Sequence, residues 1–405
     1  MSDRPPAWCP RPQGRADAAE RPLTGQHHCG TVATSMSPPS VLEHELATGQ
    51  TIEQTPSGRW LETHPVLEAL RQRRATDSRP GNRNDPWKIG LAVEGGGMRG
   101  IVSAAMLTAI EDLGFHYAFD DVYAASSGAI NSAYFLATNT WYPLSIYYDD
   151  LACRKFVDFR RALTGRPILD MEYAFENVVE VIKPLDFSAV LKAPIRFHVS
   201  VTLVDELRTL DVSGFESRAD LKETLRASAW LPVAVPGTAV WRGQRAIDGG
   251  VLTAFPFRLA QRDGCTHILS LSTRPMSLPQ RRHSVTQRFA ASRINKLQHG
   301  LGEGYLRAVR EGWQDRRDLQ DQMTRPKDAP AILDLAPLPW MRQVQRHELD
   351  LAKLLAGART AYGVMYCALN NVSPDRIRDN TLRIIPRLTA VEHVVPLDAS
   401  SGLSQ

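Results

Sequence analysis

The sequence has few of the features that mark secreted, membrane-spanning or zinc-binding proteins. Its 405 residues include only five cysteines, which are widely scattered and form no CxxC pair. This pattern excludes a disulfide framework and a cysteine-based zinc site. No apolar run reaches the ~18 residues of a membrane span, and the N-terminus lacks the apolar segment of a secretory signal. We therefore expect a cytoplasmic protein.

A strong excess of one charge is also missing. The chain carries 48 basic and 44 acidic side chains, a formal net charge of +4, which gives no reason to expect nucleic acid binding. Hydrophobic residues make up 43% of the chain and charged residues 23%, enough for a sizeable core. Residues 1–60 are the exception, because they contain eight prolines and no apolar period. They are predicted to be a disordered leader.

After this leader, short apolar strands alternate with helices. We expect a short helix and a linker in residues 61–86, a catalytic α/β core in residues 87–275, and a mainly helical extension packed on the core in residues 276–405. The alternation predicts a three-layer α/β/α fold with a central, mostly parallel sheet. The expected strands are Lys88–Val93, Asp121–Ala125, Ile195–Val204, Leu207–Val212, Gln244–Ile247, His267–Ser272, Ile332–Leu335 and Leu382–Ile385. The main expected helices are Leu61–Arg74, Met98–Leu113, Ser127–Leu136, Pro143–Leu163, Asp170–Val181, Leu221–Trp230 and Arg346–Leu369.

A glycine-rich loop joins the first core strand to the next helix. It consists of Gly95, Gly96, Gly97, Met98, Arg99 and Gly100. Glycines leave backbone N–H groups uncovered, and the helix N-terminus adds a positive dipole end, so the loop suits a negatively charged oxygen. That oxygen belongs either to a phosphate or to the oxyanion of an acyl intermediate. The loop lacks the lysine of a P-loop, and the alternative is a tight turn without a ligand.

A serine pair follows the second core strand. Ser126 has Ala124 and Gly128 two positions to either side, whereas Ser127 has Ala125 and Ala129. A nucleophile elbow needs small residues at these positions, and the glycine favours Ser126. The alternative is that one of the serines only caps the helix.

A third motif, Asp248-Gly249-Gly250, follows the expected strand Gln244–Ile247. On its own it is also typical of an ordinary Asp-Gly turn.

Together, in this order, the three motifs resemble those of the patatin-like phospholipases. The family pattern of GGGxRG, GxSxG and DGG matches Gly95–Gly100, Ala124–Gly128 and Asp248–Gly250, with Ala124 in place of the first elbow glycine. The resemblance implies a Ser–Asp dyad without histidine, in which Ser126 attacks a lipid ester and Asp248 is the base. It implies an oxyanion hole in the loop from Gly95 to Gly100, Arg99 as a brace of that loop, and no cofactor or metal.

Two alternatives remain. In the first alternative, the chain is a catalytically weak relative that binds lipid or a protein partner, as the Ala124 departure suggests. In the second, it is a Ser-His-Asp hydrolase that uses Ser126, Asp248 and His393. Peripheral contact with a membrane or micelle has two candidate surfaces, the basic stretches 154–166 and 281–325. An ordinary solvated helix face is the alternative interpretation of each stretch.

Overall fold

The computed structural model describes residues 64–253, 255–275, 282–324 and 329–378. The predicted leader and the strand Leu382–Ile385 lie outside these residues. One mixed sheet runs in the order β5-β6-β3-β2-β1-β7-β8, and β4 pairs with β3. The strands are β1 Ile89–Val93, β2 Asp121–Ala124, β3 Arg196–Leu203, β4 Arg208–Val212, β5 Ala239–Trp241, β6 Gln244–Asp248, β7 His267–Leu271 and β8 Ala331–Leu335. Strands β3, β2, β1, β7 and β8 are parallel, whereas β4, β5 and β6 pair antiparallel.

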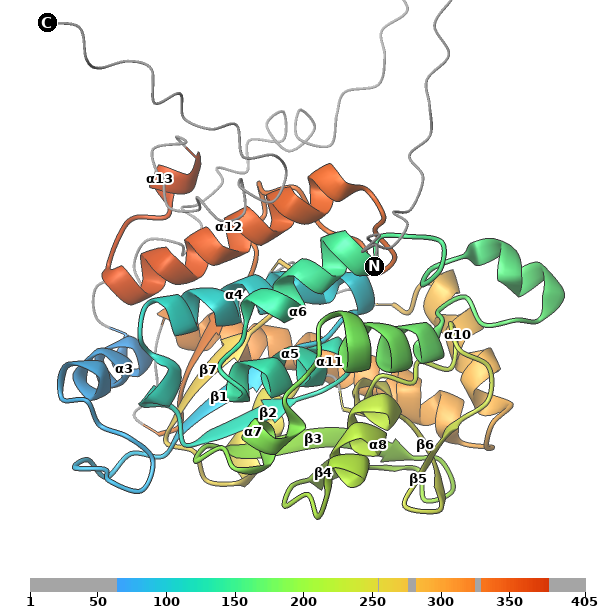
Figure 1. Ribbon diagram of the computed structural model, residues 1–405, viewed down its shortest axis with the longest axis horizontal. Helices are drawn as coiled ribbons and strands as arrows, with labels where there is room; N and C mark the ends of the chain where they lie inside the picture. The colour runs from blue at the N-terminus through green and yellow to red at the C-terminus, as the bar shows by residue number, and fades with distance from the viewer. Residues whose placement is uncertain (1–63, 254, 276–281, 325–328, 379–405) are drawn as a thin grey trace, which may run out of the picture. The chain divides into compact units, whose positions relative to one another are not determined.

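Helices cover both faces of this sheet. Along β1, Leu91 and Val93 belong to the larger apolar cluster, which contains α4 Ile101–Asp112 and α12 Leu351–Asn370. Ala92 points the other way, into a smaller cluster with residues of α9 Phe257–Arg262. Figure 1 shows α12, in red, alongside α4. The predicted α/β/α fold with a mostly parallel sheet is confirmed.

The remaining helices are mostly short. The α-helices are α3 Pro65–Ala75, α5 Ser127–Leu136, α6 Trp141–Ser145, α7 Phe187–Leu191, α8 Arg218–Ser228, α10 Val285–Asn295, α11 Leu301–Thr324 and α13 Asp375–Arg378. The 3₁₀ turns are η2 Gly97–Gly100, η3 His116–Ala118, η5 Phe159–Thr164 and η7 Gly249–Val251, and the π-helices are η4 Ile146–Asp150 and η6 Tyr173–Ile182.

Two helix predictions need correction. The helix expected over Pro143–Leu163 is broken into α6, η4 and η5, because the chain pairs Val157 with Leu169 instead of continuing to coil. The helix expected from Arg346 begins at Leu351, where the Asp350 side chain accepts the Lys353 N–H at 3.2 Å and caps the first turn. Residues 346–350 therefore lie outside the helix, and the Arg346 carbonyl accepts the Met98 N–H of the glycine-rich loop.

The segment predicted as a linker after α3 is held to the core by a buried arginine. Arg73 is 1% exposed and forms ion pairs of 2.7 Å with Asp85 and 2.8 Å with Asp120. It also donates to the carbonyl of Trp87 at 2.7 Å. Arg83, within the same segment, also pairs with Asp120 at 2.8 Å, so two cations hold this segment to the core.

Candidate active site

Ser126 stands on a sharp turn between β2 and α5. Its backbone has φ 58° and ψ −138°, a conformation that residues other than glycine rarely adopt. Backbone strain of this kind occurs mainly at functional sites. The N–H of Ser126 donates to the hydroxyl of Ser228, at the end of α8, at 3.0 Å. This hydrogen bond helps to hold the turn.

The two positions flanking the turn differ in how tightly they are packed. A Cβ at Gly128 would lie 2.6 Å from the Val93 carbonyl oxygen, so only glycine fits there. Ala124 lies inside β2, between Val93 and Val199 on the neighbouring strands, and its methyl is fully buried in the core. The elbow therefore accommodates the alanine that departs from the family pattern.

We expect Ala124→Gly to leave the rate of hydrolysis unchanged or slightly raised while lowering stability by about 1–2 kcal/mol. The change removes a buried methyl and makes the unfolded chain more flexible. Measurements of kcat and thermal unfolding test this prediction. A large loss of rate in a folded variant would show that the turn is built around alanine.

Asp248 ends β6, which returns antiparallel along β3. It is 5% exposed, and one carboxylate oxygen accepts the Gly250 N–H at 2.7 Å. Burial raises the pKa of Asp248, while the Ser126 side chain, the Gly250 amide and the charge of Arg346 act in the opposite direction. The sheet thus brings together the two residues that the sequence analysis singled out, and the raised pKa makes the carboxylate a stronger base.

The N–H groups of the glycine loop have different partners. The Gly96 N–H donates to the Ser127 hydroxyl at 2.9 Å, and the Met98 N–H donates to the Arg346 carbonyl at 3.0 Å. The Gly97 N–H has no partner among the described residues, and Gly97 lines the same cavity as Ser126. Of the six predicted loop residues, Gly97 is therefore the best placed to bind an oxyanion.

Gly97 also needs its missing side chain. Its φ is +61°, and a Cβ there would lie 2.8 Å from the Arg346 carbonyl oxygen. Gly95 is similarly restricted, because its Cβ would lie 2.5 Å from the Ala125 carbonyl. Both glycines allow close approach of neighbouring backbone, a reason that the sequence analysis did not give for this loop.

Ser127 has a different function from its neighbour, since its hydroxyl accepts a loop amide. Ser127→Ala is expected to lower kcat by about tenfold, because a loop no longer held at Gly96 shifts the oxyanion donors. Steady-state kinetics on an ester, with covalent labelling of Ser126 as the control for an intact nucleophile, check this. Full activity would show that the loop does not depend on this hydrogen bond.

Buried charged side chains, among them Arg99 and Glu94, pack beside the glycine-rich loop. Arg99 is 8% exposed, and its Nε donates to the Thr273 hydroxyl at 3.1 Å. The Glu94 carboxylate accepts the Thr273 N–H at 2.6 Å and the Arg274 guanidinium at 3.1 Å. The Thr273 hydroxyl in turn donates to the Gly95 carbonyl at 3.0 Å, and the role of Arg99 as a brace of the loop stays a prediction. Sequence reasoning missed Thr273, Arg274, Ser228 and Arg346, which have no motif of their own.

An apolar cavity opens beside Ser126 and Gly97. Its wall is formed mainly by α5, the two π-helices and the segments joined by the bridge between Val157 and Leu169. The apolar residues that line it are Ile130, Pro143, Ile146, Tyr147, Leu151, Phe156, Leu169, Met171, Ala174, Phe175, Val178, Val179 and Ala229. Such a surface is chemically suited to a hydrocarbon chain.

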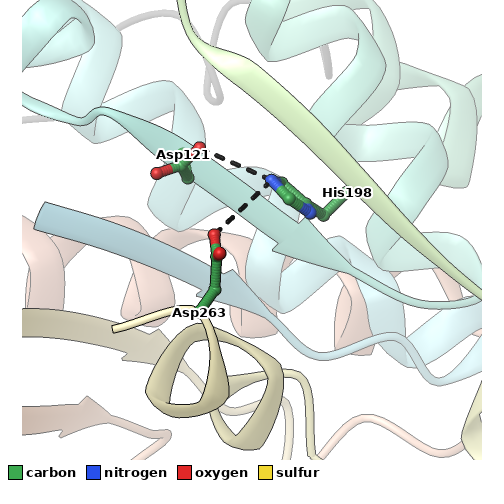
Figure 2. A group of neighbouring side chains, drawn as sticks. All are labelled: Asp121, His198 and Asp263. Carbon is green, nitrogen blue, oxygen red and sulfur yellow. Dashed lines mark ion pairs between the residues drawn. The ribbon is translucent and has the colours of Figure 1, made fainter. Parts of the chain in front are cut away.

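A second cluster lies at the opposite end of the parallel strands, at the start of β2. Asp121, His198 and Asp263 point toward one another (Figure 2) with spacing that a metal ion could bridge. Cations already occupy these carboxylates, since Arg196 pairs with Asp121 at 2.7 Å and Lys88 pairs with Asp263 at 2.7 Å. The donor set therefore favours an ion-pair network over a metal centre.

His198 makes this network sensitive to pH. Burial lowers its pKa, but hydrogen bonds and ion pairs with Asp121 and Asp211 outweigh this and raise the pKa to about 9. Its contribution to stability is therefore complete below the ordinary pKa of 6.5 and is lost as the pH rises through 9. We expect the free energy of unfolding to fall across this range, and His198→Gln to flatten the fall. His116→Gln is the control, because burial lowers the pKa of His116 to about 4. An unchanged slope in His198→Gln would refute the assignment.

The comparison with family models agrees with the motifs. A family model described as patatin-like phospholipase matches residues 91–260. The uncharacterized protein YjjU of Escherichia coli K12 is 22% identical over 267 residues, which are 62% of this chain and 69% of YjjU. Among solved structures, VipD of Legionella pneumophila has a TM-score of 0.39 at 11% identity, covering 71% of this chain and 67% of VipD. Human group IVD cytosolic phospholipase A2 has a TM-score of 0.40 at 14% identity, covering 79% of this chain and 64% of the human enzyme.

Proposed function

We propose that this protein is a serine hydrolase that cleaves carboxylic esters of phospholipids or acylglycerols through an acyl-enzyme on Ser126. The family model that matches residues 91–260 supports this proposal. The observation that carries the proposal is the strained Ser126 at an apolar cavity, beside the buried Asp248 and the Gly97 amide. The choice of a lipid as substrate is supported by the family match and by the apolar lining of the cavity.

The chemistry follows from these positions. Asp248 removes the proton as Ser126 Oγ attacks the ester carbonyl, since serine is a weak nucleophile without a base. The Gly97 N–H donates to the oxyanion that forms. Asp248 then protonates the leaving alcohol, and water, activated by the same carboxylate, releases the fatty acid and restores Ser126.

The test combines covalent labelling with a lipid panel. A fluorophosphonate probe should label the wild-type chain and not Ser126→Ala, and wild-type protein that has not been treated with the probe should release fatty acid from at least one phospholipid, lysophospholipid or acylglycerol. Absence of labelling in folded protein would refute the proposal.

A weakly active lipid-binding relative is the second candidate, favoured by the two loop amides that bind Ser127 and Arg346. It predicts slow labelling without measurable turnover. The Ser-His-Asp alternative finds no support within residues 64–253, 255–275, 282–324 and 329–378, where no histidine is among the groups acting on Asp248. His393 lies outside these residues.

The setting of this activity is also a proposal. No helix in the described ranges is long and apolar enough to cross a bilayer. A cytoplasmic location, and contact with a lipid surface that is only peripheral, remain predictions from the sequence.

A further inference from the structure

An exposed excursion of the chain, residues 154–166, borders the apolar cavity. Leu151 and Phe156 line the cavity where the excursion begins, and Leu169 lines it where the chain returns. Between them, Phe159 is 51% exposed and Leu163 is 90% exposed. Two large apolar side chains are therefore presented to solvent beside the cavity that we assign to the acyl chain.

The same excursion carries positive charge. Arg154, Lys155, Arg160 and Arg166 are all exposed, and none of the four forms an ion pair with a described residue. Arg161 differs, because it lies 3.6 Å from Asp170. In the sequence, the four basic side chains without an ion pair lie on both sides of the exposed Phe159 and Leu163. Exposed apolar and basic side chains together suit the interface of an anionic bilayer.

The excursion is held in one shape by its own hydrogen bonds. The Asp158 side chain accepts the Arg160 N–H at 2.9 Å, and the Arg161 guanidinium donates to the carbonyls of Arg154 at 3.2 Å and Lys155 at 3.0 Å. Gly165 ends the η5 turn in the left-handed conformation. A preformed surface loses less conformational entropy when it binds.

The excursion also touches the segment that supports the glycine loop. The Phe159 ring meets the His347 ring edge-on at 5.2 Å between centroids. The neighbouring residue, Arg346, accepts the Met98 N–H through its carbonyl oxygen. Phe159 is therefore linked through His347 and Arg346 to Met98, the residue that follows the proposed oxyanion donor Gly97.

We propose that residues 154–166 are the docking surface of this protein for an anionic lipid bilayer, with Phe159 and Leu163 entering the interface and the four unpaired cations contacting the head groups. This proposal rests on the proposed function in one respect, namely that the neighbouring cavity binds the acyl chain of the substrate. Of the two basic stretches in the sequence, it selects the one that adjoins the active-site cavity.

The experiment measures binding of the full chain to phosphatidylcholine vesicles with and without phosphatidylglycerol. All proteins carry Ser126→Ala, so that vesicles stay intact and binding is measured separately from hydrolysis. We expect binding only to the anionic vesicles. The double variant Phe159→Ser/Leu163→Ser and the quadruple variant Arg154→Gln/Lys155→Gln/Arg160→Gln/Arg166→Gln should each weaken it by about tenfold or more.

A matched control lies on α10, where Val285 and Phe289 are 83% and 62% exposed in the other basic stretch. Val285→Ser/Phe289→Ser should bind anionic vesicles as the parent does, and thermal unfolding should show that all variants are folded. Loss of binding in the α10 variant with retention in the excursion variants would overturn the proposal, as would equal binding by all proteins or absence of binding to anionic vesicles. Because binding is scored in an inactive background, failure of the hydrolase proposal would appear instead in the labelling and lipid-panel assays.

Discussion

Ser126→Ala and Asp248→Asn are each expected to lower the rate of ester hydrolysis by about 10⁴-fold or more, since a nucleophile and its base act as one unit. Both residues are fixed by backbone that does not depend on their side-chain chemistry. Ser126 is held through its own N–H, and Asp248 is held in β6, where its N–H donates to the Trp230 carbonyl at 2.9 Å. Fatty-acid release from the best substrate in the lipid panel is the measurement.

The controls separate loss of chemistry from loss of fold. Circular dichroism should be unchanged in both variants, and Ser127→Ala should keep the covalent labelling that Ser126→Ala loses. A single His→Ala variant that folds but is as inactive as Asp248→Asn would assign the protein to the Ser-His-Asp class.

Glu94→Ala is expected to lower the free energy of unfolding by about 3–5 kcal/mol, the typical cost of removing one partner from a buried charge cluster. Glu94 is 7% exposed and faces the guanidinium groups of Arg99, Arg274 and Arg316. Without the carboxylate, the three arginines would lose the negative charge that they share. Urea unfolding is the measurement, and Asp205→Asn, which breaks only the exposed pair with Arg245, should have no detectable effect. Equal stability of Glu94→Ala and wild type would show that the arginines are solvated in some other way.

The same carboxylate predicts a dependence on acid. Burial raises the pKa of Glu94, but the three arginines outweigh this and lower the pKa to about 2. The stabilisation is therefore present above the ordinary pKa of 4.5 and is lost as the pH falls from 4.5 toward 2. Glu94→Gln should show a shallower loss of stability over that interval, and an identical acid profile would contradict the assigned pKa.

The sequence predicted the parallel centre of the fold well and its edges less well. The buried strand β1 is a continuous run of apolar residues and glycine, and this pattern is typical of a parallel strand covered on both faces. The three-residue strand β5 was missed, because its pairing with β6 depends on a hairpin rather than on its own pattern. The helix expected across Pro143–Leu163 was wrong because the tertiary pairing of Val157 with Leu169 outweighed local helical preference.

In the candidate site, too, some residues could be predicted from the sequence and others could not. Ser126, Asp248 and the glycines were found because close backbone approach and nucleophilic chemistry restrict residue type at fixed spacing. Ser228 and Arg346 were not found, because they contribute a hydroxyl oxygen and a carbonyl oxygen to distant backbone N–H groups. Almost any residue supplies a carbonyl oxygen, so the contribution of Arg346 to the loop leaves no trace in the sequence.

The contact between the Arg346 carbonyl and the Met98 N–H affects how the catalytic unit is delimited. The family match ends at residue 260, yet the segment after it provides β7, β8 and the carbonyl that receives a loop amide. A fragment cut at the limits of the match would lose two sheet strands and leave the Met98 amide without its acceptor. The family match thus covers the three sequence motifs, whereas the sheet that carries them continues to β8, beyond the matched residues.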